Sequence, residues 1–98
     1  MKAPAAFKTV CRNFIQDYEL VASTPEGLID FAIGSLASRD IRVIHAFLDE
    51  VVSGSLSEQE LQQLWLSTPA EIHLSDGKQV LAFLTLMKSR IARRIGLD

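Results

Sequence analysis

The sequence predicts an all-α protein: a single domain over residues 1–98, folded as a compact bundle of about five helices with the C-terminal helix longest and central. Three observations lead to this prediction. Apolar residues recur three and four positions apart along most of the chain, which is the period of one helix face. Residues that begin and end helices separate these stretches at short intervals. The segment Ala70–Leu74 looks extended, but it has no second alternating run to pair with and is expected to connect two helices.

The first two helices are predicted from their starts. Pro4 takes a first-turn position ahead of an apolar face that reaches Phe14, so this helix is expected to run to about Ile15. Thr24 is expected to cap the second helix, because its hydroxyl can accept from unpaired backbone N–H groups and Pro25 follows it. The predicted buried face of the second helix is Leu28, Ile29, Ala32, Ile33 and Leu36.

Capping residues also delimit the next two helices. Ser38 is expected to cap the third helix, which continues at helical spacing until Gly54, a residue suited to the left-handed conformation after a helix end. Ser57 and Glu60 match the capping box, in which a hydroxyl and a carboxylate each accept from the other residue's backbone N–H. They open a short helix that Pro69 ends.

The last helix carries the longest apolar stripe. Ser75, Asp76 and Gly77 form the predicted turn into it, and Gly96 ends it. A stripe of this length marks the helix as the spine of the core. The stripe consists of Val80, Leu84, Met87, Ile91 and Ile95, flanked by Leu81 and Phe83.

Composition favours a small globular protein. With 48% hydrophobic and 22% charged residues, the chain is expected to form one core without a metal or disulfides. The lone Cys11 shares a face with Phe7 and Phe14, so we expect a buried, unreactive thiol. The N-terminal stretch has no apolar run resembling a signal peptide, and no window reaches the roughly 20 apolar residues of a membrane span. We therefore expect a cytoplasmic protein that is not bound to a membrane.

Residue patterns typical of catalysis are missing, so an enzyme is not expected. His45 and His73 lie far apart without a cysteine pair, unlike the ligands of a zinc site; we expect His45 at the rim of the third helix and His73 on the surface. Asp76 and Gly77 lack the alternating oxygen ligands of a calcium loop. No glycine-rich phosphate loop or nucleophile elbow occurs. No cofactor and no metal are predicted.

Charge is unevenly distributed along the chain. Between residues 13 and 76 there are eleven acidic residues and two basic ones, Arg39 and Arg42, whereas both ends are basic. The C-terminal run KSRIARR suits the negative end of a helix dipole, and the acidic centre disfavours its alternative reading as a nucleic-acid contact. Trp65 is expected in the core, with an exposed binding anchor as the alternative.

Four stretches between about residues 7 and 91 share a family pattern: FIQDYEL after the first helix, TPEGLIDFA, FLDEVVSGSLSEQELQQLW and SDGKQVLAFLTLMKSRI. Together they resemble the small helical immunity proteins of contact-dependent growth inhibition systems. The resemblance implies a non-catalytic bacterial protein that binds and neutralises, by occlusion, the cognate toxin domain of a large secreted protein, often a nuclease. It also implies that Gln16 and Asp17 fix the turn between the first two helices while Tyr18 covers the core edge.

The acidic residues are the candidate toxin contacts. Negative charge facing a basic toxin accelerates encounter and disfavours wrong partners; a solvated surface that merely confers solubility is the alternative. A different function also stays open: a helical adaptor or a regulatory or antitoxin module that contacts nucleic acid through its basic C-terminal helix. A homodimer is left open as well. The candidate contacts are Asp17, Glu19, Glu26, Asp30, Asp49, Glu50, Glu58, Glu60, Glu71 and Asp76.

Overall fold

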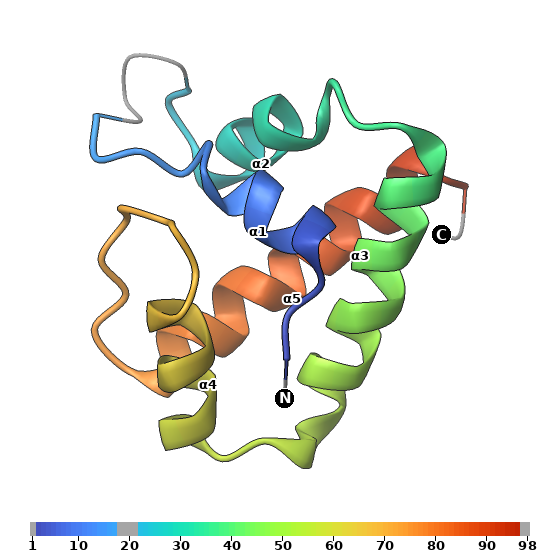
Figure 1. Ribbon diagram of the computed structural model, residues 1–98. Helices are drawn as coiled ribbons and strands as arrows, with labels where there is room; N and C mark the ends of the chain where they lie inside the picture. The colour runs from blue at the N-terminus through green and yellow to red at the C-terminus, as the bar shows by residue number, and fades with distance from the viewer. Residues whose placement is uncertain (1, 18–21, 97–98) are drawn as a thin grey trace.

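Figure 1 shows the computed structural model, which describes residues 2–17 and 22–96. Within these residues the chain forms five α-helices and one short π-helix, and no strand. The prediction of an all-α bundle is confirmed. The elements are α1 (Ala5–Cys11), α2 (Pro25–Ile33), α3 (Ser38–Glu50), η2 (Val51–Ser55), α4 (Glu58–Leu66) and α5 (Gly77–Arg94).

The central element is α5, which is also the longest helix, at 18 residues. It packs against α2, α3, α4 and η2, and Figure 1 shows these elements arranged around it. Its apolar stripe faces inward as predicted. None of the helices in the described residues is both long and apolar enough to cross a membrane. The buried residues of the stripe are Val80, Leu84, Met87 and Ile91.

An aromatic cluster joins the end of α1, α4 and α5. The rings of Phe14, Trp65 and Phe83 lie with their centroids 5.2 to 6.1 Å apart, a spacing at which aromatic pairs attract one another. Trp65 is only 3% exposed, and its indole N–H donates to the carbonyl of Ile72 at 3.1 Å. The expectation that Trp65 belongs to the core is confirmed, and its hydrogen bond holds the connecting segment against α4.

The first helix is shorter than its apolar period suggested. It ends at Cys11, not near Ile15. The N–H of Phe14 bonds to the carbonyl of Cys11, three residues back, which tightens the chain into a turn. The carbonyl of Phe14 accepts the N–H of Glu71 at 2.8 Å, a partner from a distant part of the chain. Phe14 extends the apolar period because it enters the aromatic cluster, although it lies beyond the helix.

The start of α3 differs from the prediction, whereas its end agrees. Ser38 is the first helical residue; the cap position belongs to Ala37, which has extended backbone and makes no side-chain hydrogen bond. Ser38 cannot cap because its own backbone is already helical. Gly54 has φ +96°, the predicted left-handed conformation. A left-handed glycine at a helix end allows a backbone N–H to bond to the carbonyl five residues back. This hydrogen-bond pattern is that of a π-helix, the form that Val51–Ser55 takes.

The predicted starts of α2, α4 and α5 are confirmed, whereas Pro4, expected in the first turn of the first helix, has extended backbone and is the cap residue before α1. The hydroxyl of Thr24 accepts a backbone N–H at 3.0 Å, and a carboxylate oxygen of Asp76 does the same at 2.9 Å, each three residues into its helix. Ser57 and Glu60 form both hydrogen bonds of the capping box, at 3.0 and 3.1 Å. Gly96, at φ +76°, follows the end of α5. These signals act over three or four residues, which is why the sequence reveals them.

The N-terminal ends of α4 and α5 meet in a contact that no other residue type than glycine would allow. A Cβ atom on Gly77 would lie 2.2 Å from the carbonyl oxygen of Glu58, so the two backbones touch directly. Beside them, the side-chain amide of Gln62 donates to the carbonyl of Ser75 at 3.3 Å, and the N–H of Ser75 donates to Gln79 Oε1 at 2.8 Å. We call this contact, formed by residues 57–62 and 75–79, the α4–α5 junction.

Candidate functional site

The predicted acidic contacts are exposed, but they are spread over several elements. Glu19, like Tyr18, lies outside the residues that the structure describes. The side chains of the other nine are all exposed. They come from the loop after α1, from α2, from the end of α3, from the start of α4, from the segment before α5 and from the cap of α5. Their hydrogen bonds divide them into groups with different roles.

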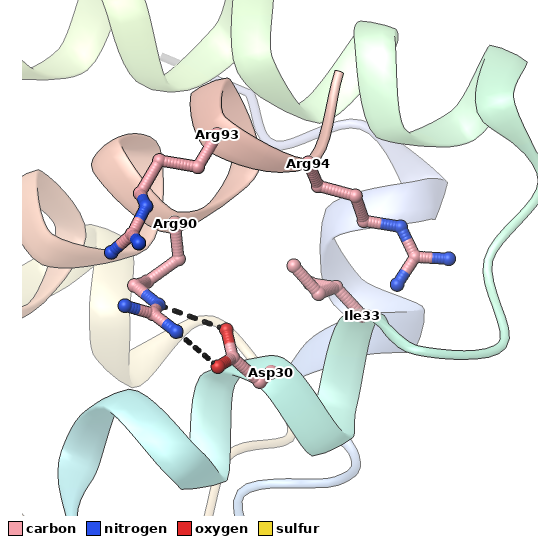
Figure 2. Close-up of a pocket in the computed structure, with 5 residues that line it drawn as sticks. All are labelled: Asp30, Ile33, Arg90, Arg93 and Arg94. Atoms are coloured by element: carbon pink, nitrogen blue, oxygen red, sulfur yellow. Dashed lines mark hydrogen bonds and ion pairs between the residues drawn. The ribbon is translucent and has the colours of Figure 1, made fainter. Parts of the chain in front are cut away.

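Two of these carboxylates are paired with cations of α5. Arg90 donates from Nε to Asp30 Oδ1 at 2.9 Å and from Nη2 to Asp30 Oδ2, which makes a two-bond pair (Figure 2). Lys88 Nζ lies 2.7 Å from Asp49 Oδ1. The hydrogen bond from Arg90 lowers the pKa of Asp30, and the bond from Lys88 lowers the pKa of Asp49. Both pairs attach α5 to a neighbouring helix, α2 in one case and α3 in the other.

Two further carboxylates act as helix caps. Glu60 accepts the backbone N–H of Ser57, and this hydrogen bond is the main cause that lowers the pKa of Glu60. Asp76 accepts a backbone N–H in the first turn of α5. A capping carboxylate still presents negative charge to solvent, but its oxygen is already partly satisfied by the backbone.

Glu71 holds the loop that follows α1. Its Oε1 accepts the backbone N–H of Gln16 at 3.2 Å, while its own N–H donates to the carbonyl of Phe14. The described part of this turn is therefore fixed by a side chain 55 residues further along the chain, acting on the backbone of Gln16. We expected Gln16 and Asp17 to fix this turn. The turn is held at Gln16, but the side chain that holds it is that of Glu71, which was not predicted.

The densest acidic surface is the turn from α3 through η2 into α4, residues 49–60, which we call the α3–α4 corner. It carries Asp49, Glu50, Glu58 and Glu60 and no basic residue. The hydroxyls of Ser53 and Ser55 both donate to the carbonyl of Glu50, at 2.6 and 3.3 Å. With the capping box on its other side, hydrogen bonds constrain the corner at both ends. In the described structure, the carboxylates of Glu50 and Glu58 enter no hydrogen bond or ion pair.

Basic residues gather on the opposite side of the fold, where the last turns of α5 lie along α2. An open cavity of about 350 Å³ is lined there by Asp30, Ile33, Arg90, Arg93 and Arg94 (Figure 2). Besides the pair with Asp30, Arg94 Nη2 donates to the carbonyl of Gly34, just after α2, at 3.0 Å. Figure 2 shows the guanidinium groups of Arg90 and Arg93 on one side of Ile33 and that of Arg94 on the other. We call the contact of α2 with residues 82–94 the α2–α5 seam.

These bonds change the interpretation of the basic run. The sequence suggested a helix-dipole role for KSRIARR, with nucleic acid as the alternative. Arg93 and Arg94 do lie in the last turn of α5, as the helix-dipole role requires. In addition, Arg90 binds the side chain of Asp30 and Arg94 binds the backbone carbonyl of Gly34, each partner lying 60 residues away in the chain. No local signal could have predicted those partners. A role in nucleic-acid binding stays a prediction.

An apolar cavity, which the sequence did not reveal, lies nearer the N-terminal end of α5. Its volume is about 280 Å³, and a second of about 210 Å³ shares Pro25, Leu74 and Phe83 with it. Ala82 is exposed and Leu86 half-buried, so apolar surface continues outside the core stripe of α5. The only signal in the sequence was that apolar residues cover more than half of the circumference of this helix. The larger cavity is lined by Pro25, Leu74, Gln79, Ala82, Phe83 and Leu86.

The remaining candidate groups take the positions expected for them. Cys11 is fully buried, and burial raises the pKa of its thiol to about 12, against a smaller opposite effect of a hydrogen bond with Thr68. His45 is half-buried on α3, and His73 is exposed before α5. Among residues 2–17 and 22–96, no three His, Cys, Asp or Glu side chains come together as a metal site would require.

Comparison with protein-family models, with curated proteins and with solved structures finds no match for this chain. Arguments about function therefore rest on two surfaces. One is the α3–α4 corner, where acidic side chains gather on a rigid turn. The other is the α2–α5 seam, where an apolar cavity and a basic cavity lie along the same pair of helices.

Proposed function

We propose that the protein is a non-catalytic immunity protein that binds the cognate toxin domain of a large secreted bacterial protein and neutralises it by occlusion. The α3–α4 corner is the proposed centre of contact. One observation supports this choice: four carboxylates lie within residues 49–60, a stretch of sequence without a basic residue, and although Lys88 of α5 pairs with Asp49, the carboxylates of Glu50 and Glu58 are exposed and unpaired in the described structure.

The chemistry of the corner suits a basic partner. A nuclease must attract phosphate, so the approach to its active site carries positive charge. A concentrated negative surface steers such a partner and raises the rate of association. Because hydroxyl bonds and the capping box already hold the corner, little conformational entropy would be lost when it binds.

The proposal is narrower than the acidic set predicted from the sequence. Asp30 and Asp49 are bound to cations of α5, so their charges are partly neutralised within the protein. Glu71 holds the loop after α1. Contact with the toxin is therefore assigned mainly to Glu50 and Glu58, with Glu60 beside them.

The first experiment identifies the partner. Tagged protein is captured from its source cells, washed at moderate salt and analysed by mass spectrometry. A stoichiometric C-terminal fragment of one large secreted protein is the expected result. Recovery of polymerase, ribosomal or nucleic-acid components instead would contradict the immunity proposal and favour the regulatory alternative.

Charge reversals then test the corner. The double variant E50K/E58K is expected to weaken toxin binding at least tenfold, mainly at low salt, because two uncompensated charges are reversed. D40K is the matched control: Asp40 lies in the first turn of α3, about 15 Å along the helix from Glu50. Equal affinities of the double variant and wild type would remove the corner from the interface, even if the toxin were correctly identified.

A further inference from the structure

Two cavities of opposite character follow one another along the α2–α5 seam. The two helices run in the same direction, because Pro25 lies with Leu86 at the first cavity, while five residues further along α2 Asp30 meets Arg90. Figure 2 shows this second part of the seam, with α2 below and the end of α5 above. The apolar cavity and the basic cavity are thus two sections of one surface.

The basic section carries more positive than negative charge. Three guanidinium groups line it, against the one carboxylate of Asp30. Glu26, one turn earlier on α2, adds a second negative charge that acts on Arg90. Arg93 and Arg94 are exposed to solvent. A carboxylate from outside can still approach these two side chains, because a guanidinium group offers five N–H donors.

The apolar section is small: its volume of about 280 Å³ lies near the roughly 300 Å³ at which pockets for drug-sized ligands begin. It is open, and the exposed methyl group of Ala82 leaves room for close approach. These dimensions fit a few aliphatic side chains presented by a larger partner.

We propose that the α2–α5 seam is a docking groove for an amphipathic helix of a partner protein. The helix places aliphatic side chains beside Ala82 and Leu86 and acidic side chains against Arg93 and Arg94. Ala82 and Arg93 are eleven residues apart on α5, about 16 Å, which is the length of three helical turns. The basic section is complementary in charge to the acidic side chains of the partner helix. The order of the apolar and basic sections fixes the direction in which that helix lies in the groove. The groove uses none of residues 49–60 and is independent of the proposed toxin contact.

A library of 18-residue helical peptides displayed on phage tests this proposal, with the wild-type protein as bait. Enriched peptides are expected to carry aliphatic residues three and four apart in one half and Asp or Glu two to three turns away. Synthetic copies are then titrated against two variants. A82R fills the apolar section and R93E reverses the charge of the basic section, and each is expected to weaken binding at least tenfold.

Matched controls lie on another helix. A46R and R42E make the same chemical changes at exposed positions of α3 and are expected to change affinity less than twofold. Thermal melts verify that each variant is folded. The proposal is overturned if no peptide is enriched, if enriched peptides bind A82R as tightly as wild type, or if they lack acidic residues and ignore R93E. A dimer in sedimentation experiments that A82R dissociates would overturn it too, because the occupant would then be a second copy.

Discussion

The two ends of α5 are attached to the bundle by opposite means. At the α4–α5 junction, two backbones touch at Gly77 and Glu58, and uncharged amide and carbonyl groups complete the contact. At the α2–α5 seam, the chain relies on long side chains: Arg90 pairs with Asp30, and Arg94 reaches the carbonyl of Gly34. The junction is close-packed, whereas the ion pair of the seam is half-exposed to water.

This difference predicts different weaknesses. The backbone contact between Gly77 and Glu58 does not tolerate added volume, and that contact itself involves no charge that salt or acid could remove. Exposed ion pairs tolerate changes in shape, since their side chains can move, yet salt screens them and acid protonates them. A mutation at the Gly77–Glu58 contact should therefore destabilise the fold by steric overlap. A mutation at the seam should have an effect on stability that depends on salt and pH.

The largest effect is expected for G77A. Its methyl group would overlap the backbone of Glu58, so α4 and α5 must separate, at a cost of about 3 kcal/mol in the free energy of unfolding. The control is G54A, where the added Cβ meets open space and only the left-handed backbone conformation is strained, by about 1 kcal/mol. Urea unfolding measures both. Equal losses for the two variants would mean that the contact at Gly77 is not tight.

Cys11 provides a second measure of the same variant. Its buried thiol, with a pKa of about 12, should react with a thiol reagent at pH 8 only after the structure opens. A loss of 3 kcal/mol should increase the labelling rate roughly a hundredfold, since about 1.4 kcal/mol corresponds to a factor of ten. An unchanged rate in G77A would contradict the expected loss of stability.

An intermediate effect is expected for S57A. It removes the hydroxyl that accepts the N–H of Glu60 and should lower the free energy of unfolding by about 1 kcal/mol, independently of salt. S35A is the control, because Ser35 is exposed between α2 and α3. Its urea midpoint should match that of wild type. A salt-dependent loss in S57A would show that the charge of the Glu60 carboxylate in the capping box, and not the Ser57 hydroxyl alone, stabilises this end of α4.

The smallest effect is expected for D30N at the seam: less than about 1 kcal/mol at pH 7, as for other half-exposed ion pairs. Arg90 lowers the pKa of Asp30 in the folded state, so the stabilisation is present above the ordinary carboxyl pKa and is lost as the pH falls through the lowered one. Urea midpoints of wild type and D30N should therefore converge below about pH 4, and also in 1 M salt. A gap that persists in acid would contradict this role for the pair.

The sequence revealed what depends on near neighbours. The caps at Thr24 and at Ser57 with Glu60, the turn at Asp76 into α5 and the left-handed Gly54 each need only a few residues, and all were predicted; that Asp76 also caps α5 was not. The end of α1 was misplaced because Phe14 continues the apolar period beyond the helix. An apolar period indicates which side chains are buried. It does not indicate where the backbone hydrogen bonds of the helix end.

The candidate contacts show a limit of the same kind. A carboxylate bound to a distant cation has the same sequence signature as one that is unpaired in the structure. Asp30 could not be distinguished from Glu50, because its partner Arg90 lies 60 residues away. The aliphatic residues of the seam were equally ambiguous, since on a central helix either side can face the core. Only the arrangement of helices separates these roles.

The central position of α5 also bears on how the protein forms during synthesis. This helix follows α2, α3 and α4 in the chain, yet it supplies the apolar stripe against which all three pack. Until it leaves the ribosome, the earlier helices can bury only the surface that α1 shares with α2 and α3, and helices of 9 to 13 residues are marginal on their own. The chain therefore cannot complete its core step by step as it emerges. Its half-made form therefore presents the apolar faces of α2, α3 and α4 to whatever binds nascent chains.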